Sequence, residues 1–152
     1  MKVPFLDLRA GYIQQKVEID SAVQRVMESG WYILGEEVDA FEREYADHCK
    51  AKWCVGVANG LDALRLALIA LGVSKGDEVI VPSNTYIATW LAVSQCGAKP
   101  VPVEPVENTC NIDPDRIQEA ITSRTKVIIP VHLYGQPAEM DRILNIARSY
   151  GI

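Results

Sequence analysis

Apolar positions near the start of the chain repeat with the period of a helix. One series, with intervals of four and three residues, consists of Ile19, Val23 and Val26. A second series, which would share one helical face, consists of Val38, Phe41, Tyr45 and His48. Because the turn signal Ser29-Gly30 separates them, we expect two helices joined by the unusually apolar connection 31–35.

From Trp53 onward, short apolar runs alternate with helical stretches. The runs typical of strands cover residues 53–58, 78–82, 100–103 and 126–133. The stretches typical of helices cover residues 61–71, 85–95, 114–123 and 138–150. This alternation is typical of βαβ units on a mostly parallel sheet, so the expected fold class is α/β with helices flanking the sheet.

Two segments carry more specific expectations. The helix over 61–71 contains only Asp62 and Arg65 as charged residues, so we expect it to be buried nearly all round. The prolines of the 100–103 run suit an edge strand or the end of a strand, because proline cannot donate to a central ladder.

The alternating pattern stops in mid-course. Gly151 would cap the last helix, and Ile152 stands where the next strand should begin. Such a chain leaves an unpaired sheet edge, so we expect residues 1–152 to be the N-terminal portion of a larger domain. No linker interrupts the sequence, and no internal domain boundary is predicted.

Composition narrows the class of protein. The chain has 152 residues, with 49% hydrophobic and 23% charged residues, values typical of a soluble globular protein. A net charge of −5 does not indicate a positively charged surface of the kind that binds nucleic acid. The longest apolar run, 66–71, is too short to span a bilayer, and Asp7 and Arg9 stand where a signal peptide needs apolar residues. We therefore expect a cytoplasmic protein without membrane partners.

The cysteines and histidines give no metal-ligand spacing. None of the four cysteines forms a C-x-x-C pair, and the two histidines are far apart in sequence. No metal site is predicted.

A candidate phosphate site lies in the segment 57–64. Gly60 falls between a predicted strand and helix, where its missing side chain lets a ligand approach the backbone. The amides of Leu61, Asp62 and Ala63 would then point out of a helix N-terminus, which favours an anion such as a phosphate monoester. The alternative is an ordinary tight turn without a ligand. The segment matches neither G-x-G-x-x-G nor the P-loop, which argues against a nicotinamide dehydrogenase and an NTPase.

Two further strand ends carry candidate side chains. Tyr86 follows the 78–82 strand, where a planar ring held by its phosphate at Gly60 could stack on it. The alternative is a tyrosine that packs on its own helix. His132 and Tyr134 follow the 126–133 run and could line a substrate pocket, although His132 could also be a buried histidine with its hydrogen bonds satisfied.

In combination, six segments resemble one family, the DegT/DnrJ/EryC1/StrS sugar-nucleotide aminotransferases. These segments, which are specific only in their order and spacing, are VPFLDL at 3–8, GWYILG at 30–35, VANGLDAL at 57–64, GDEVIVP at 76–82, NTYIAT at 84–89 and PVHLYGQ at 130–136. The sequences of the second and last segments are similar to those of the branch of the family that makes 3-amino-3,6-dideoxyhexoses.

The resemblance implies a fold, a reaction and residue roles. It implies part of the large domain of the aspartate-aminotransferase type of fold, with pyridoxal 5'-phosphate as cofactor. The substrate would be a dTDP-linked 3-keto-6-deoxyhexose, the amino donor glutamate, and the complete protein a homodimer. The residues implied to bind the cofactor are Gly60, Leu61, Asp62 and Tyr86, and those implied to approach the sugar are Tyr32, His132 and Tyr134.

The same resemblance implies that essential groups are absent from this chain. Transamination needs a Schiff-base lysine and an acid beside the pyridine nitrogen, and the family carries both after the point that matches Ile152. No lysine between residues 50 and 126 follows a strand in a way that would replace it. The chain alone is therefore predicted to be inactive. Two alternatives remain open: a related sugar dehydratase with histidine in place of the lysine, and a non-catalytic phosphate-binding module.

Overall fold

A computed structural model describes residues 3–152, and their packing divides the chain into two compact units, Met1–Gly56 and Val57–Ile152. The first two residues of the predicted 1–152 domain portion lie outside the described residues. The division concerns packing, and the domain range 1–152 stays a prediction.

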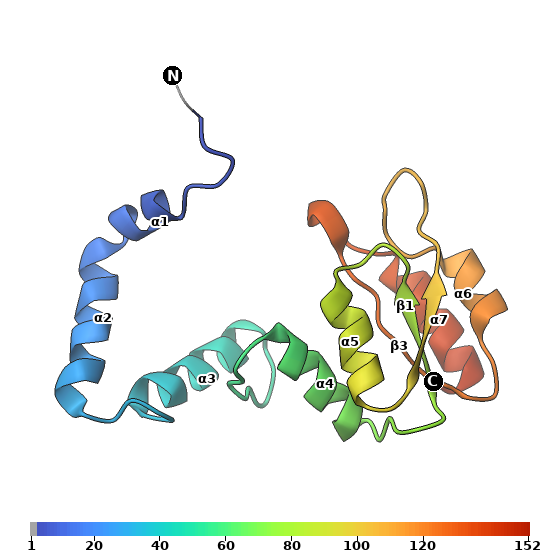
Figure 1. The fold of residues 1–152 in the computed structure, drawn as a ribbon, viewed down its shortest axis with the longest axis horizontal. Helices are drawn as coiled ribbons and strands as arrows, with labels where there is room; N and C mark the ends of the chain where they lie inside the picture. The colour runs from blue at the N-terminus through green and yellow to red at the C-terminus, as the bar shows by residue number, and fades with distance from the viewer. Residues whose placement is uncertain (1–2) are drawn as a thin grey trace. The chain divides into compact units, whose positions relative to one another are not determined.

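The described part of the first unit contains three helices, α1 (Leu8–Gln14), α2 (Lys16–Ser29) and α3 (Glu36–His48) (Figure 1). The last two confirm the helical series in the sequence, and Gly30 ends α2 with a left-handed φ of +67°. Helix α1 was not predicted. It begins at the side chain of Asp7, which accepts a hydrogen bond from the Ala10 amide at 3.1 Å.

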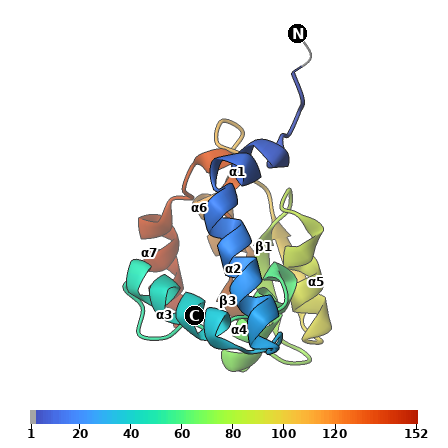
Figure 2. The same ribbon diagram turned by 90° about the vertical axis from the view of Figure 1, so that its left-hand side faces the viewer.

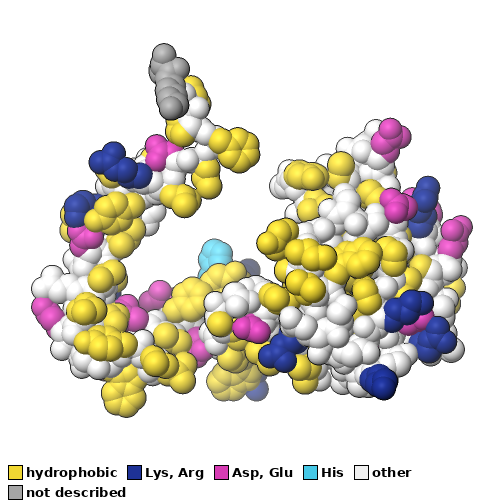
Figure 3. All heavy atoms as spheres, in the orientation of Figure 1, with side chains coloured by type: hydrophobic (Ala, Val, Ile, Leu, Met, Phe, Trp, Pro, Cys, Tyr) yellow, Lys and Arg dark blue, Asp and Glu magenta, His cyan; other side chains and the backbone are white. Residues whose placement is uncertain are grey.

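The first unit has almost no core. Ala46 is the one buried hydrophobic residue in its described part. Figure 3 shows many hydrophobic side chains at the surface of this unit, and the most exposed of its hydrophobic residues include Phe5, Val17, Ile33 and Trp53. Burial within this unit therefore contributes little to the stability of its helices.

The strand predicted over 53–58 is wrong. These residues form an irregular segment in which Trp53 and Val55 are about three-quarters exposed. A strand needs a neighbour for its backbone groups, and the described residues offer this segment none. Instead, the Gly56 amide donates to the side chain of Glu42 in α3 at 2.6 Å.

The second unit is built on a three-stranded parallel sheet. Its strands are β1 (Glu78–Pro82), β2 (Lys99–Val103) and β3 (Thr125–Ile128), in the order β2-β1-β3. The predicted parallel sheet is confirmed, and so is the position of the proline-containing β2 at an edge. All five residues of β1 are buried, because strands flank it on both sides and helices cover both faces.

Helices α4 (Gly60–Ala70) and α5 (Ile87–Gln95) pack on one face of the sheet, and α6 (Pro114–Ala120) and α7 (Met140–Tyr150) on the other. Figure 2 shows α5 and α7 on opposite sides of the strands. Because side chains alternate along a strand, Val79 and Val81 of β1 enter the first core and Ile80 enters the second. The second core also contains Val103, Ile112, Ile117, Ala138 and Ile143.

Helix α4 is less buried than predicted. Leu68 is 2% exposed, but Leu66 and Ile69 on the opposite face are almost half exposed. Only one face of α4 packs against the core of its unit, so the expectation of burial nearly all round is wrong.

The last predicted strand is shorter than its apolar run. The β1–β3 ladder ends where the Ile129 amide donates to the Ile80 carbonyl at 2.9 Å. Pro130 comes next and has no N–H, so the pairing stops and a short 3-10 turn, Leu133–Gly135, follows.

No helix of the described residues is long and apolar enough to cross a membrane.

Candidate functional site

The start of α4 is the candidate phosphate site, and it is capped by Asn59. The Asn59 side chain accepts a hydrogen bond from the Asp62 amide at 3.0 Å, and the backbone carbonyl of Asn59 accepts one from the Ala63 amide at 3.1 Å. Two of the three amides expected to face an anion are therefore already bonded within the chain. The open donors are one step earlier, at Gly60 and Leu61, whose amides have no partner among the described residues.

Gly60 leaves space at this point. A methyl group built in place of its hydrogen meets no atom within 4 Å, and its φ does not lie in the left-handed region. Neither the backbone conformation nor the packing of the chain therefore requires glycine here. The open space fits a ligand that approaches the backbone closely.

The Asp62 carboxylate is occupied by neighbours on its own helix turn. One oxygen accepts a hydrogen bond from the Asn59 amide group at 3.3 Å, and the other lies 3.7 Å from Nε of Arg65. Arg65 and Asn59 thus offset the negative charge that Asp62 brings to the first turn.

Tyr86 stands at the corresponding point of the neighbouring helix. It is the N-cap residue of α5, its side chain makes no capping hydrogen bond, and the residue is 77% exposed. Helix α5 runs antiparallel to β1, so it begins toward the carboxyl-terminal end of that strand (Figure 1). The ring is available to a ligand, and the alternative that it packs on its own helix is not favoured by this exposure.

The turn after β3 presents His132 and Tyr134. Nδ1 of His132 accepts a hydrogen bond from the Ala138 amide at 3.0 Å. The proton of the neutral ring is then on Nε2, which remains a donor. Tyr134 is 84% exposed and has a left-handed φ of 55°, followed by Gly135 with a φ of 80°. A tyrosine in this region is strained, and the turn must be fixed by its surroundings.

Asn111 provides that fixation, and the sequence analysis missed it. Its buried side chain accepts a hydrogen bond from the Leu133 amide and donates one to the Gln136 carbonyl, both at 2.9 Å. Asn84 similarly donates to the Cys110 carbonyl at 2.9 Å. An asparagine close to a predicted helix start would be interpreted as the N-cap of that helix. Nothing in the sequence indicates that its side chain bonds to a residue more than 20 positions away.

Tyr32 belongs to the first unit and lines a cavity of about 560 Å³ there. The cavity lies between the end of α2 and the start of α3, and its wall includes Trp31, Leu34 and an ion pair of Arg25 with Glu37 at 2.8 Å. The hydrogen bond from Arg25 holds the pKa of Glu37 below its ordinary value. This cavity contains aromatic, acidic and basic groups and is large enough for part of a sugar.

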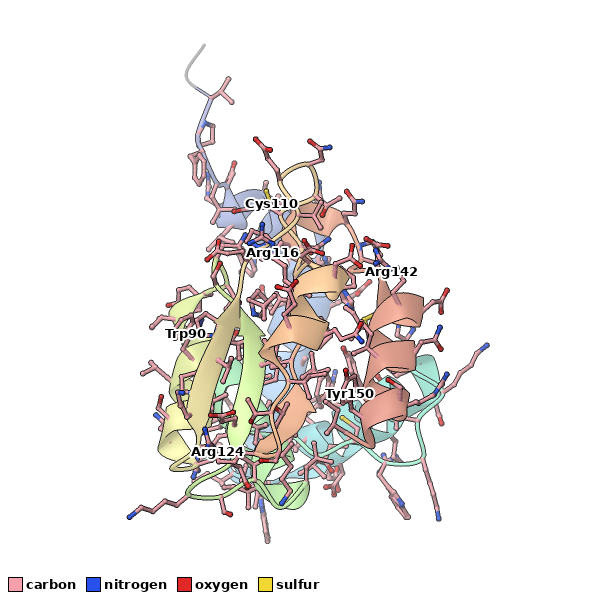
Figure 4. All side chains as sticks on the ribbon, turned by 90° about the vertical axis from the view of Figure 1, so that its right-hand side faces the viewer. Trp90, Cys110, Arg116, Arg124, Arg142 and Tyr150 are labelled. Atoms are coloured by element: carbon pink, nitrogen blue, oxygen red, sulfur yellow. The ribbon has the colours of Figure 1, made fainter. Side chains whose placement is uncertain are left out.

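The opposite end of the sheet carries an enclosed ionic cluster. The carboxylate of Glu78, at the start of β1, accepts hydrogen bonds from the Thr122 hydroxyl and Arg124, both at 2.6 Å, and lies 3.5 Å from Nζ of Lys99. These contacts, with Thr122 first, lower the pKa of Glu78 from 4.5 to about 2. Figure 4 shows Arg124 at one end of the strands and Cys110 at the other.

Two lysines of the second unit, Lys99 and Lys126, form hydrogen bonds or ion pairs near the amino-terminal end of the sheet. Lys126 donates to the Gly72 carbonyl at 2.7 Å and lies 3.7 Å from Asp77. Lys99 faces Glu78, as described above. Both lysines therefore have structural partners at this end of the sheet.

Comparison with known proteins places these features in a family. The model of the DegT/DnrJ/EryC1/StrS aminotransferase family matches residues 14–152. The dTDP-3-amino-3,6-dideoxy-alpha-D-galactopyranose transaminase of Aneurinibacillus thermoaerophilus is 60% identical over 150 residues, which cover 99% of this chain and 41% of that protein. The chain spans about two fifths of the length of the curated relatives it matches.

Two solved structures have the same arrangement. DesV of S. venezuelae has a TM-score of 0.97 and 54% identity, with 99% of this chain and 41% of that chain covered. NtdA of Bacillus subtilis with bound cofactor PMP has a TM-score of 0.94 and 38% identity, with 99% and 35% covered. They confirm the predicted likeness to the fold of pyridoxal-phosphate aminotransferases. With a matching family model over most of its length and relatives of this similarity, the chain belongs to the DegT/DnrJ/EryC1/StrS aminotransferase family.

Proposed function

We propose that this chain is the N-terminal portion of a cytoplasmic, homodimeric transaminase that depends on pyridoxal 5'-phosphate. The complete enzyme transfers an amino group from glutamate to C3 of a dTDP-linked 3-keto-6-deoxyhexose in amino-sugar biosynthesis. The relative from A. thermoaerophilus, named for a dTDP-3-amino-3,6-dideoxy sugar, supports this substrate class.

The observation that carries the proposal is the open start of α4. Among residues 3–152, the amides of Gly60 and Leu61 have no hydrogen-bond partner, and no atom lies within 4 Å of the point where a Gly60 side chain would begin. A phosphate ester there would accept hydrogen bonds from both amides and gain from the helix dipole. Asp62 takes part through the capped turn it shares with Asn59, which fixes the direction of the two open amides.

Tyr86 would contact the pyridine ring. Its exposed side chain follows the carboxyl end of β1, where ligands of open α/β sheets bind. Stacking of two aromatic rings contributes roughly 0.5–1.5 kcal/mol beyond the burial of their surface. The tyrosine therefore orients the ring while the phosphate anchors it.

The bound cofactor supplies an electron sink for moving a proton at the carbon that gains or loses the amino group. The residues of this chain bind and orient, and the groups that move that proton lie outside it. On the sugar side, Nε2–H of His132 can donate to a sugar oxygen, because Nδ1 is held by the Ala138 amide. Tyr134 and Tyr32 offer hydroxyl groups for the same purpose.

The first test uses the 152-residue chain. Mixed with pyridoxal phosphate, it should develop no imine absorbance and leave no borohydride-fixed adduct, and it should not convert a keto sugar. A site-specific adduct on one lysine would overturn the inactivity of the chain. The protein encoded by the coding sequence read past Ile152 should aminate the dTDP sugar, whereas release of a dehydrated sugar would favour the related dehydratase.

The second test isolates the phosphate site. Titration with inorganic phosphate or pyridoxal phosphate should shift the NMR signals of the Gly60 and Leu61 amides. In the variant Gly60→Ala the amide remains, but the added methyl group would occupy the space through which a phosphate approaches it. Binding to the variant should weaken by at least about tenfold, as expected when a charge-assisted hydrogen bond of roughly 1.5–3 kcal/mol is lost. Its thermal stability should not fall, because the added methyl meets no atom and alanine favours helices.

The matched control is Gly11→Ala. Gly11 also lies in a helix with open space beside it, but in α1 of the first unit. This variant should bind as the parent does. Equal phosphate binding by the parent and by Gly60→Ala would remove the cofactor site from the start of α4.

A further inference from the structure

Asn111 is a buried polar residue in the loop between β2 and α6. It is 3% exposed, and both ends of its side-chain amide are used. Its own carbonyl accepts a hydrogen bond from the Val106 amide at 2.9 Å, so the backbone of Asn111 is fixed as well. These bonds hold the buried amide in one position, since each broken bond would leave a buried polar group without a partner.

The partners of Asn111 bracket the strained turn. The Leu133 amide lies immediately before Tyr134, and the Gln136 carbonyl immediately after Gly135. Tyr134 and Gly135 are the two consecutive residues with left-handed φ values of 55° and 80°. One side chain therefore closes the turn at both ends and offsets the strain of a left-handed tyrosine.

The same loop is tied to the start of α5. Asn84 donates to the carbonyl of Cys110, the residue before Asn111, at 2.9 Å. Asn84 is two positions before Tyr86 in the sequence. The loops after all three strands are thus joined by two asparagine side chains, with Asn111 at the centre.

We infer that Asn111 is a positioning residue, which holds His132 and Tyr134 in the orientation that the sugar substrate requires. The inference rests on the proposed function for the role of those two residues. Asn111 acts through them, because its own donor and acceptor are already bonded to Leu133 and Gln136. It therefore sets the geometry of the substrate side without contributing to the phosphate site at Gly60.

The bonds of Asn111 go to loop backbone and not to the strand ladders. The register of β1 with β2 and β3 involves none of its atoms. Loss of the side chain should accordingly loosen the 132–136 turn and leave the sheet in place. That separation makes the role measurable.

The experiment compares Asn111→Ala and Asn111→Asp with the parent chain by amide hydrogen exchange. In the alanine variant the Leu133 amide should exchange at least about tenfold faster, while the Ile80 amide in β1 stays protected. Aspartate keeps the acceptor for Leu133 and loses the donor for Gln136, so it should give an intermediate rate. Gln118→Ala is the matched control, because it removes an exposed side-chain amide bonded only to Tyr150.

In the complete protein, obtained by reading the coding sequence past Ile152, Asn111→Ala should raise KM for the keto sugar roughly tenfold and change kcat by less than about threefold. The affinity for pyridoxal phosphate should stay unchanged, which a purely destabilising variant would not allow. An unchanged Leu133 exchange rate, or a KM no higher than that of Gln118→Ala, would overturn the inference. If the parent protein does not aminate sugars, the proposed function fails, while the exchange data still test whether Asn111 holds the turn.

Discussion

At the scale of single residues, Glu78 is the carboxyl group whose pKa the fold lowers to about 2. Its carboxylate is enclosed by a hydroxyl, a guanidinium and an ammonium group. These groups favour the charged form more than burial disfavours it, and the pKa falls from 4.5 to about 2. The folded state therefore binds this proton less readily than the unfolded state does.

Acid should destabilise the second unit through this residue. Because the folded pKa is lower than the unfolded one, the stabilisation is complete above about pH 4.5 and is lost as the pH falls toward 2. In Glu78→Gln, that part of the pH dependence should disappear, and the melting temperature at pH 7 should be lower than that of the parent. Urea unfolding at several pH values checks both expectations, and an unchanged slope between pH 4.5 and 2 would contradict the assignment.

At the scale of elements, helix α6 is held against the sheet by a fully buried isoleucine. Ile117 is fully buried between the helix and the sheet, in the core that also contains Ile80 and Ile143. The N-cap Asp113, whose side chain accepts a hydrogen bond from the Asp115 amide at 2.9 Å, starts the helix, and the first helical residue, Pro114, is buried as well. The packing of Ile117 should thus determine whether α6 stays on the sheet.

Truncation of this side chain should be costly. Ile117→Ala should lower the free energy of unfolding by about 2–5 kcal/mol, and Ile117→Val by about 0.5–1.5 kcal/mol. Ile33→Ala, at a residue that is 79% exposed, should change it by less than about 0.5 kcal/mol. Urea titration followed by circular dichroism measures all three, and equal effects of the two alanine substitutions would contradict this core.

The elements also show how far sequence patterns reach. Caps and periodicity predicted α2, α3, α6 and the central strand, because these signals are local and strong. They failed at 53–58 and at the outer face of α4, where the outcome depends on whether another element covers the segment. In the site, the turns at Tyr86 and His132 could be predicted from strand ends, whereas the helix start at Gly60 follows an irregular segment in place of the predicted strand. Asn111 could not, because its partners are fixed only by the fold.

At the scale of the whole molecule, the two units differ in how they are stabilised. The second unit has two hydrophobic cores around a buried strand, whereas Ala46 is the buried hydrophobic residue of the first among residues 3–56. Burial of apolar surface is the main source of folding free energy. The units should therefore differ in the ease with which they open.

Amide hydrogen exchange on the intact chain should reveal this difference. The amides of β1 should be the slowest to exchange, and those of α1, α2 and α3 should exchange close to the rate of an open chain. A single uniform rate over both units would show that they unfold together and contradict the expectation.

The enclosed carboxylate of Glu78 and the loops that carry the ligand chemistry lie at opposite ends of the same strand. Strand β1 has five residues, so roughly 13 Å separates its first and last positions, whereas Arg124 and Lys99 lie within 4 Å of the Glu78 carboxylate. A charged cofactor arriving at one end would thus alter the proton affinity at the other much less than these two cations do. Acid tolerance and the working pH of the enzyme could then be engineered as separate properties, each by substitutions at its own end of the strand.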